Sequence, residues 1–194
     1  MEIKKFNLFK DFTKLKKLLL KEERWSFGSY ESKLKKRRCM NLYIIRSLCC
    51  SDNVYVYKND NDLLGIIGID YHKRKTFKKI IANMALKIFC LFITKKQKNG
   101  IYEYYFGTEN AYKGSPCCES VITLLMVDKE KRGLGVGKEL IEYAENKLRK
   151  ISVANIGVNT DSCCDYKFYE KMKYVRVFEG DFNEDEIFFY KKDF

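Results

Sequence analysis

The fold is decided by the stretch Leu124-Leu-Met-Val-Asp-Lys-Glu-Lys-Arg-Gly-Leu-Gly-Val-Gly-Lys-Glu-Leu140. An apolar run typical of a strand passes into a turn with alternating glycines, and an amphipathic helix begins directly after it. Glycines lack a Cβ, so backbone N–H groups in such a turn can approach an anion closely. The helix points the positive end of its dipole at the same place, and Arg132 and Lys138 add formal charge. The stretch therefore predicts a unit that binds a diphosphate.

The glycine spacing excludes two common nucleotide-binding loops. A Walker A loop needs four residues between its first glycine and the Gly-Lys pair, and a Ser or Thr after the lysine. Here only three residues separate Gly133 from Gly137, and Lys138 is followed by Glu139. A dinucleotide-binding loop reads G-x-G-x-x-G with an acidic residue about 20 positions later, and residues 152–159 contain no acid. The pattern that remains is Arg-x-x-Gly-x-Gly, from Arg132 to Gly137.

A second motif lies downstream, where Asn159 ends a predicted strand and Phe168-Tyr-Glu-Lys-Met-Lys-Tyr174 follows it. The two motifs, in this order and at this distance, resemble the coenzyme A loop and the "FYEK(L/M)GF" helix of the GNAT acetyltransferases. The specific resemblance covers residues 119–179, and the first half matches in general pattern only. It implies one α/β domain over residues 1–194, with a mixed, mostly antiparallel central sheet flanked by helices.

The resemblance also implies acetyl-CoA as co-substrate, without a metal. Backbone N–H groups of the strand before the loop would hold the oxyanion, and those left free by a splayed neighbour would bind the pantetheine amides. The residues expected to bind the cofactor are Leu125, Met126, Val127, Arg132, Gly133, Leu134, Gly135, Val136, Gly137, Lys138, Asn159 and Tyr166. For Asn159 the alternative is a turn residue that ends a strand.

Three side chains are candidates for proton transfer. Tyr169 matches the family's tyrosine, and a phenol that titrates near 10 can give a proton to a thiolate; the alternative is core packing, with Tyr166 as the weaker candidate acid. Some family members carry a glutamate that acts as the general base, at the position where this chain has Val121. Glu119 lies two residues earlier on the same strand face and would act through water; the alternative is a solvated strand-end carboxylate. Lys173 replaces the family's usual glycine. If its backbone is left-handed, the lysine lowers the stability of the fold by about 1 kcal/mol.

Composition bounds the class of protein. With 194 residues, 46% of them hydrophobic and 33% charged, the chain suits one soluble domain. The net charge of +12 fits either an acidic partner, such as coenzyme A, RNA or a membrane surface, or a lysine-rich composition without long charge blocks. Eight cysteines include three adjacent pairs, and no apolar signal segment follows the N-terminus, which predicts a reducing cytoplasm. A single histidine and no C-x-x-C pair disfavour a zinc site.

The hydrophobic pattern predicts the order of the elements. Strands are expected at 2–8, 53–57, 63–71, 101–106, 120–127, 155–159, 174–178 and 186–190, and helices at 9–23, 30–48, 136–150 and 164–172. In the 136–150 helix, Val136, Leu140, Ile141, Ala144 and Leu148 form the apolar face, and Glu139, Glu142, Glu145 and Arg149 the polar face. By resemblance, the first two helices form part of the acceptor site.

Residues 73–98 form an insertion with lysine-rich ends and an apolar middle from Ile80 to Thr94. A helix of about 15 residues is too short to span a bilayer. We expect it to pack on the core beside the acceptor cleft; the alternative is a membrane-surface helix.

Together these features predict an acetyl-CoA-dependent N-acetyltransferase that acts on a primary amine of a small-molecule or protein acceptor. Two alternatives stay open: a non-catalytic acyl-CoA-binding or sensor domain, and a basic membrane-surface or RNA-binding protein. Nucleic acid is the less favoured partner, because no long block of like charge occurs.

Overall fold

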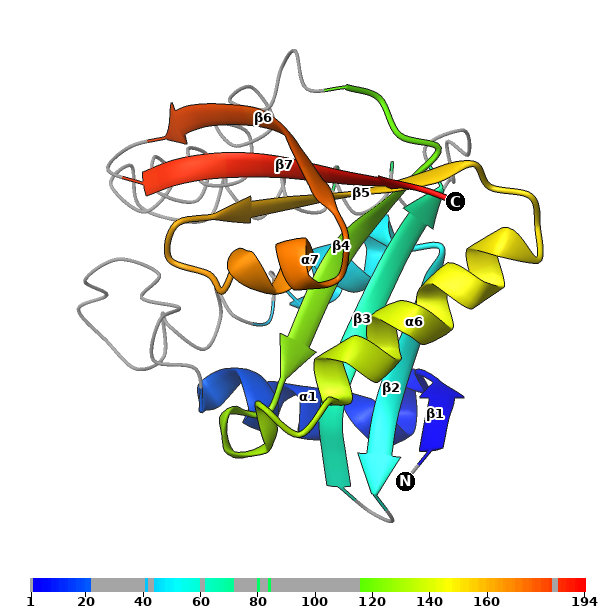
Figure 1. Ribbon diagram of the computed structural model, residues 1–194. Coiled ribbons are helices and arrows are strands. Elements are labelled where there is room, and N and C mark those ends of the chain that lie inside the picture. The colour runs from blue at the N-terminus through cyan, green and yellow to red at the C-terminus, as the bar shows by residue number, and fades with distance from the viewer. Residues whose placement is uncertain are drawn as a thin grey trace.

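The computed structural model describes residues 2–21, 41, 44–59, 62–71, 80, 84, 116–182 and 185–194. A seven-stranded sheet with the order β1-β2-β3-β4-β5-β7-β6 organises them (Figure 1). Its strands are β1 (Glu2–Lys5), β2 (Asn53–Asn59), β3 (Asp62–Tyr71), β4 (Ser120–Val127), β5 (Asn155–Asp161), β6 (Val175–Phe182) and β7 (Asp185–Asp193). Only the β4–β5 pair is parallel, so the predicted mixed, mostly antiparallel sheet is confirmed.

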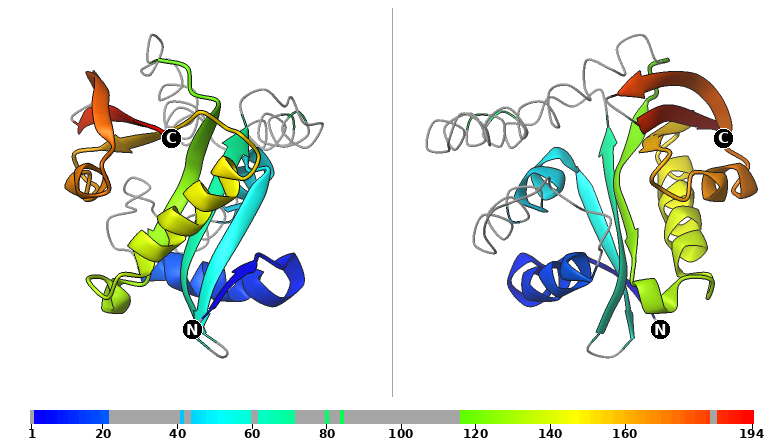
Figure 2. Two further views of the ribbon diagram at one scale, coloured as in Figure 1. Left: turned by 45° about the vertical axis from the view of Figure 1, so that its right-hand side comes forward. Right: turned by 90° about the vertical axis from the view of Figure 1, so that its left-hand side faces the viewer.

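Helices cover both faces of the sheet (Figure 2). Helix α1 (Leu8–Leu20) and the helical residues 44–50 pack on one face, against Val56, Ile66 and Leu124. Helices α6 (Val136–Arg149) and α7 (Lys167–Lys171) lie on the other face. The core beneath α6 continues without a break from β3 to β7. Each face of the sheet is therefore closed by helices, as an α/β domain requires.

The first helix is fixed to the sheet at its N-terminus. The Asn7 side chain caps α1 by accepting hydrogen bonds from the N–H groups of Phe9 and Lys10. Asp11 is fully buried; it accepts one bond from the Asn7 N–H and one from Lys58 Nζ at 2.6 Å. Since Lys58 belongs to β2, this ion pair sets the position of α1 across the sheet.

Two predicted details are wrong. Glu145 was expected on the solvent face of α6, but it is only 3% exposed and pairs with Lys192 of β7. Helix α7 begins at Lys167 and not at Cys164 as expected, and Cys164 lies in the exposed turn before it. The first error comes from a contact with a distant strand, which a local periodicity does not contain. The second comes from a local turn, in which the Cys164 N–H donates to Asp161. The five apolar positions expected to face the core from α6 are all buried, as predicted.

Several predictions fall outside the described residues: the start of the second helix, the strand at 101–106 and most of residues 73–98. Of that insertion, Ile80 and Met84 are described; both are helical, and each exposes about half of its surface. Whether the insertion packs beside the cleft stays a prediction. Within the described part of the chain, no helix has both the length and the apolar character needed to cross a membrane.

Candidate active site

The centre of the site is the place where two neighbouring strands part. β4 pairs with β5 over three positions only, the last being Ile122 opposite Val158. Beyond them β4 continues to Val127 and β5 to Asp161 without further pairing between the described strands (Figure 1). We call this opening the splay. It leaves one edge of β4 open beside the glycine loop.

Strand alternation identifies the backbone groups that face the splay. The N–H of Asp128, just after β4, donates to Leu64 O of β3 at 2.8 Å. N–H groups two residues apart point the same way, so that of Met126 also faces β3. Leu125 and Val127 therefore turn their N–H groups towards the splay. Of the three β4 residues expected to contact the cofactor, the backbone favours these two.

The glycine loop between β4 and α6 has the predicted anion-binding form. Gly133 and Gly135 have positive φ angles of 77° and 85°, and an added Cβ would meet nothing within 4 Å at either position. Gly135 caps α6 without a side-chain hydrogen bond, so the first N–H groups of the helix stay open to a ligand. Arg132, Leu134 and Lys138 are exposed around them.

Gly137 is required for a different reason. A Cβ there would lie 3.3 Å from Phe168 Cζ and 3.5 Å from Val127 Cγ2. Its absence lets the first turn of α6 pack closely against α7 and the end of β4. The side chain of Val136, the residue before it, is buried in the core. At these two positions the residue type is therefore set by packing.

Asp128 anchors the loop. Its carboxylate accepts a bond from the Glu130 N–H at 3.1 Å, which caps the 3-10 helix η2 (Lys129–Lys131). It accepts a second bond from Lys21 Nζ at 2.9 Å. Partial burial opposes the charged form of Asp128, but these hydrogen bonds and the Lys21 charge outweigh it and lower the pKa. An Asp directly after a strand is a helix-cap signal, whereas the partner at Lys21 has no local signal in the sequence.

Tyr169 of α7 lies in the core, near Asp161 at the end of β5. It is 8% exposed and packs edge-on against Phe168 and Tyr174. Burial, with the nearby Cys164 and Asp161, raises the pKa of its phenol, so the group stays protonated at neutral pH. Its hydroxyl makes no hydrogen bond to any residue in the described part of the chain.

Asn159 and Tyr166 lie on the β5 side. Asn159 follows Val158, the last β5 residue paired with β4, and its side chain is exposed. Tyr166 caps α7, with its ring 4.8 Å from that of Phe188 and the Arg176 guanidinium over it at 5.6 Å. Asn159 therefore lies where β5 has parted from β4, whereas the ring of Tyr166 packs against residues of β7 and β6.

Glu119 lies apart from the other candidates. Its carboxylate accepts a bond from the Ala154 N–H at 2.8 Å, and its own N–H donates to Asn155 Oδ1. It precedes the first residue of β4, and three residues of strand, about 10 Å, separate it from Ile122 where the splay begins. Tyr169 is near Asp161, at the opposite end of β5. The structure thus does not bring Glu119 and Tyr169 together.

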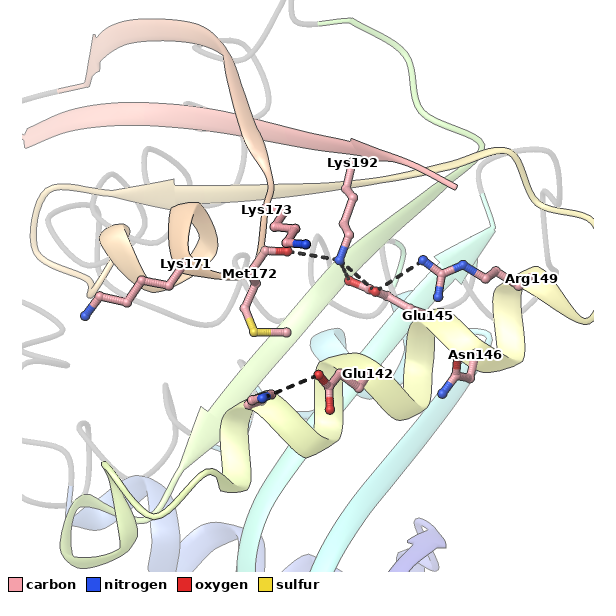
Figure 3. A pocket seen from close by; sticks show the side chains of 9 residues that line it. Glu142, Glu145, Asn146, Arg149, Lys171, Met172, Lys173 and Lys192 are labelled. Atoms are coloured by element: carbon pink, nitrogen blue, oxygen red, sulfur yellow. Dashed lines mark hydrogen bonds and ion pairs between the residues drawn. The ribbon is translucent and has the colours of Figure 1, made fainter.

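Helix α7 is held from two sides. Arg176 of β6 donates to Glu170 at 3.1 Å, and the Tyr190 hydroxyl donates to the same carboxylate oxygen at 2.7 Å. At the other end, Lys192 Nζ donates to the Met172 carbonyl at 2.9 Å and to both Glu145 oxygens at 2.8 Å (Figure 3). These contacts fix the helix that carries Tyr169.

Comparison with known proteins identifies the family. The family model described as "Acetyltransferase (GNAT) domain" matches residues 69–191. The chain belongs to the GNAT family. The predicted family and fold class, and the enzyme class N-acetyltransferase, are confirmed by this match. No curated protein matches the chain significantly.

Solved GNAT structures share the fold at low sequence identity. The Drosophila melanogaster polyamine N-acetyltransferase has a TM-score of 0.61 and 14% identity, with 100% of this chain and 99% of that one covered. An aminoglycoside 6'-N-acetyltransferase complexed with coenzyme A gives 0.57 and 13%, with 100% and 97% covered. The ribosomal-protein-alanine N-acetyltransferase from Brucella melitensis gives 0.56 and 12%, with both chains fully covered.

In this GNAT chain a pocket of about 430 Å³ lies between α6, the turn after α7 and β7 (Figure 3). Its lining is mostly charged and includes Lys138 after the glycine loop, but contains no residue of β4 or β5, so the pocket does not extend into the splay. The lining residues are Lys138, Glu142, Glu145, Asn146, Arg149, Lys171, Met172, Lys173 and Lys192. Lys173 has a φ of 64°, so the lysine that replaces the family's glycine does adopt the left-handed conformation.

Proposed function

We propose that this GNAT protein transfers the acetyl group of acetyl-CoA to a primary amine, with the splay as the reaction site. The observation that carries the proposal is the open edge of β4 directly before a loop with two positive-φ glycines. The diphosphate would bind the loop N–H groups, with Arg132 and Lys138 supplying positive charge. The pantetheine arm would pair with β4 as an added strand does, through the Val127 N–H, and would contact Asn159 on the other side, which leaves the Leu125 N–H for the reacting carbonyl. The wider set of Leu125 to Val127, Arg132 to Lys138, Asn159 and Tyr166 forms the proposed cofactor site.

The transfer forms an N–C bond and breaks the C–S bond of the thioester. The amine nitrogen attacks the carbonyl carbon, and the oxyanion would be held by a β4 N–H that faces the splay, for which Leu125 is nearest the vertex. The sulfur leaves as a thiolate. Tyr169, whose phenol stays protonated, would give it a proton and regain one from solvent.

The amine also loses a proton, for which we propose a path through water to Glu119. The distance of about 10 Å along β4 excludes direct transfer. Glu119→Gln tests this step cleanly, because the amide oxygen can still accept the Ala154 bond. The variant should keep its unfolding midpoint and lower kcat/KM at neutral pH. An unchanged kcat/KM would assign Glu119 to its structural bonds.

Coenzyme binding is tested by calorimetry with a charge-matched control. Gly135→Asp places a Cβ and a carboxylate in the empty space beside the loop and strains a φ of 85°. We expect coenzyme A binding to weaken at least about tenfold, since one phosphate contact in a charge-assisted site is typically worth 1.5–3 kcal/mol. Asn146→Asp adds the same charge on exposed α6 surface and should bind nearly as wild type does. Equal affinity of wild type and Gly135→Asp would refute the loop assignment.

The acceptor is tested with an amine panel based on the names of the structural neighbours. Agmatine, an aminoglycoside and a peptide with N-terminal alanine represent three kinds of primary amine. Release of coenzyme A that depends on the amine, together with a mass gain of one acetyl group on it, would support the proposal. Coenzyme A binding without any amine-dependent turnover would contradict it.

A further inference from the structure

A pair of hydroxyl groups lies where the splay begins. The register of β3 and β4 shifts between Gly68 and Ile69, which face Leu124 and Ile122, so Thr123 is the extra residue of a β-bulge. Its Oγ1 lies 2.6 Å from Ser51 Oγ, and that oxygen lies 2.6 Å from the Ser47 carbonyl oxygen. Ser51 follows the helical residues 44–50 on the α1 face of the sheet.

The direction of both hydrogen bonds follows from counting hydrogens. A carbonyl cannot donate, so the short contact to Ser47 requires the single hydroxyl hydrogen of Ser51. Ser51 Oγ must then accept from Thr123, whose own hydrogen is used in that bond. Thr123 Oγ1 is left with lone pairs and no hydrogen to offer. Ser47 and Ser51 are both buried, at 9% and 8% exposure, so water does not readily compete for these two hydrogen bonds.

Gly68 shows that the hydroxyl pair is built into the sheet. A Cβ at Gly68 would lie 2.5 Å from Ser51 Oγ and 2.7 Å from Thr123 Oγ1, closer than side-chain atoms approach each other. Glycine in a strand interior is destabilising, and its occurrence often marks a bulge or a close approach. The arrangement therefore combines a strand glycine, a bulge residue and the end of a helix.

The location of Thr123 relates the pair to the reaction. A coenzyme arm that enters at Val127 and follows β4 reaches the closed end of the splay after Thr123, because Ile122 is already paired with Val158. A thioester at the end of such an arm would lie beside Thr123. The half-buried Thr123 side chain contacts Ser51, which follows the helical residues 44–50 on the α1 face.

We propose that Thr123 Oγ1 accepts an N–H of the attacking amine and aims its lone pair at the thioester carbonyl, with Ser51 as the positioning residue that keeps Thr123 from donating. This inference rests on the proposed function. Because its hydrogen is used in the bond to Ser51, Thr123 Oγ1 cannot donate to the amine lone pair, which must stay free for attack. A primary amine has one N–H for Thr123 and another to lose, whereas a secondary amine has only one for both. The site therefore favours primary amines over their N-methyl derivatives.

The test compares Thr123→Val, Thr123→Ser and Ser51→Ala in the acetyl-transfer assay. Valine keeps the branched shape and removes the oxygen, so kcat/KM for the best amine of the panel should fall about tenfold, the effect of one lost hydrogen bond. The dissociation constant of coenzyme A should not change. Serine should restore activity to within about threefold of wild type. Ser51→Ala should weaken the preference for the amine over its N-methyl derivative more than it lowers kcat/KM.

The outcomes separate this inference from the proposed function. Turnover by Thr123→Val at the wild-type rate, with unchanged preference for the primary amine, would overturn the inference and leave the acetyl transfer intact. A low kcat/KM in both Thr123→Val and Thr123→Ser would also overturn it, since the loss would then reflect packing of the bulge and not the hydroxyl. Coenzyme A binding without turnover of any amine would overturn the proposed function and this inference with it.

Discussion

At the scale of single residues, burial decides which side chains keep a fixed protonation state. The phenol of Tyr169 stays protonated throughout the neutral range, because burial, together with Cys164 and Asp161 near the end of β5, raises its pKa. The sequence motif predicted the tyrosine, and its role stays a prediction. The pair formed by Ser51 and Thr123 had no sequence signal, since 72 positions separate two common residue types.

Tyr169→Phe should lower kcat by about a hundredfold and change coenzyme A binding little, because the hydroxyl acts as the thiolate leaves. The raised pKa means that loss of the phenol proton cannot reduce kcat below about pH 10. The pH profile of the variant should therefore be lower but parallel to that of wild type up to that pH. Tyr174→Phe, which changes a neighbouring buried tyrosine, should keep kcat and serves as control. An unchanged kcat in Tyr169→Phe would assign this residue to core packing.

Lys173→Gly should stabilise the protein by about 1 kcal/mol, because glycine adopts a φ of 64° without the steric penalty of a Cβ. Lys171→Gly is the matched control two residues earlier, at the end of α7, where the same change should destabilise by about 0.5–1 kcal/mol. Urea unfolding of both variants measures the difference. Equal destabilisation by the two substitutions would mean that the left-handed turn is not strained by lysine.

At the scale of elements, the sequence predicted what is local and missed what is paired across the fold. The strand, loop and helix from β4 to α6 follow from periodicity and glycines, and their bounds agree with the expected ones within a residue. The splay was expected only from the family resemblance, because periodicity does not report where a strand loses its neighbour. The buried pair of Glu145 and Lys192 could not be predicted either, since its partners are 47 positions apart.

Glu145→Ala should destabilise the fold by about 3 kcal/mol, because it leaves the ammonium of Lys192 in a site where only 16% of that side chain is exposed. Glu142→Ala removes a half-exposed carboxylate one turn earlier, 3.9 Å from Lys138, and should change stability by less than about 1 kcal/mol. Combining Glu145→Leu with Lys192→Met should recover most of the loss, since apolar groups of similar volume replace a buried pair well. Equal effects of Glu145→Ala and Glu142→Ala would show that the pair does not hold α6 to β7.

At the scale of the whole molecule, the two parts of the sheet share one core although only three residue pairs join β4 to β5. The cluster under α6 includes Ile67 of β3, Ile156 of β5 and Phe188 of β7. The predicted fold class and family agree with this architecture, because the order of apolar segments sets the topology. The single domain expected over residues 1–194 stays a prediction, and the shared core supports one cooperative unit. The acceptor could not be read from the sequence, since the splay motifs concern the coenzyme and not the amine.

Coenzyme A should stabilise the whole molecule as one unit. At a concentration of 100 times its dissociation constant, binding to the folded state alone adds about 2.7 kcal/mol. For a chain of this size that corresponds to a rise in Tm of roughly 5–11 °C. Because the proposed site uses β4, the α6 loop and β5, a single unfolding transition should move as a whole in differential scanning calorimetry. Gly135→Asp at the same coenzyme concentration should show a much smaller shift, whereas Asn146→Asp should shift like wild type. Two transitions of which only one responds to coenzyme A would contradict a single cooperative domain, and equal shifts in all three proteins would place the coenzyme away from the glycine loop.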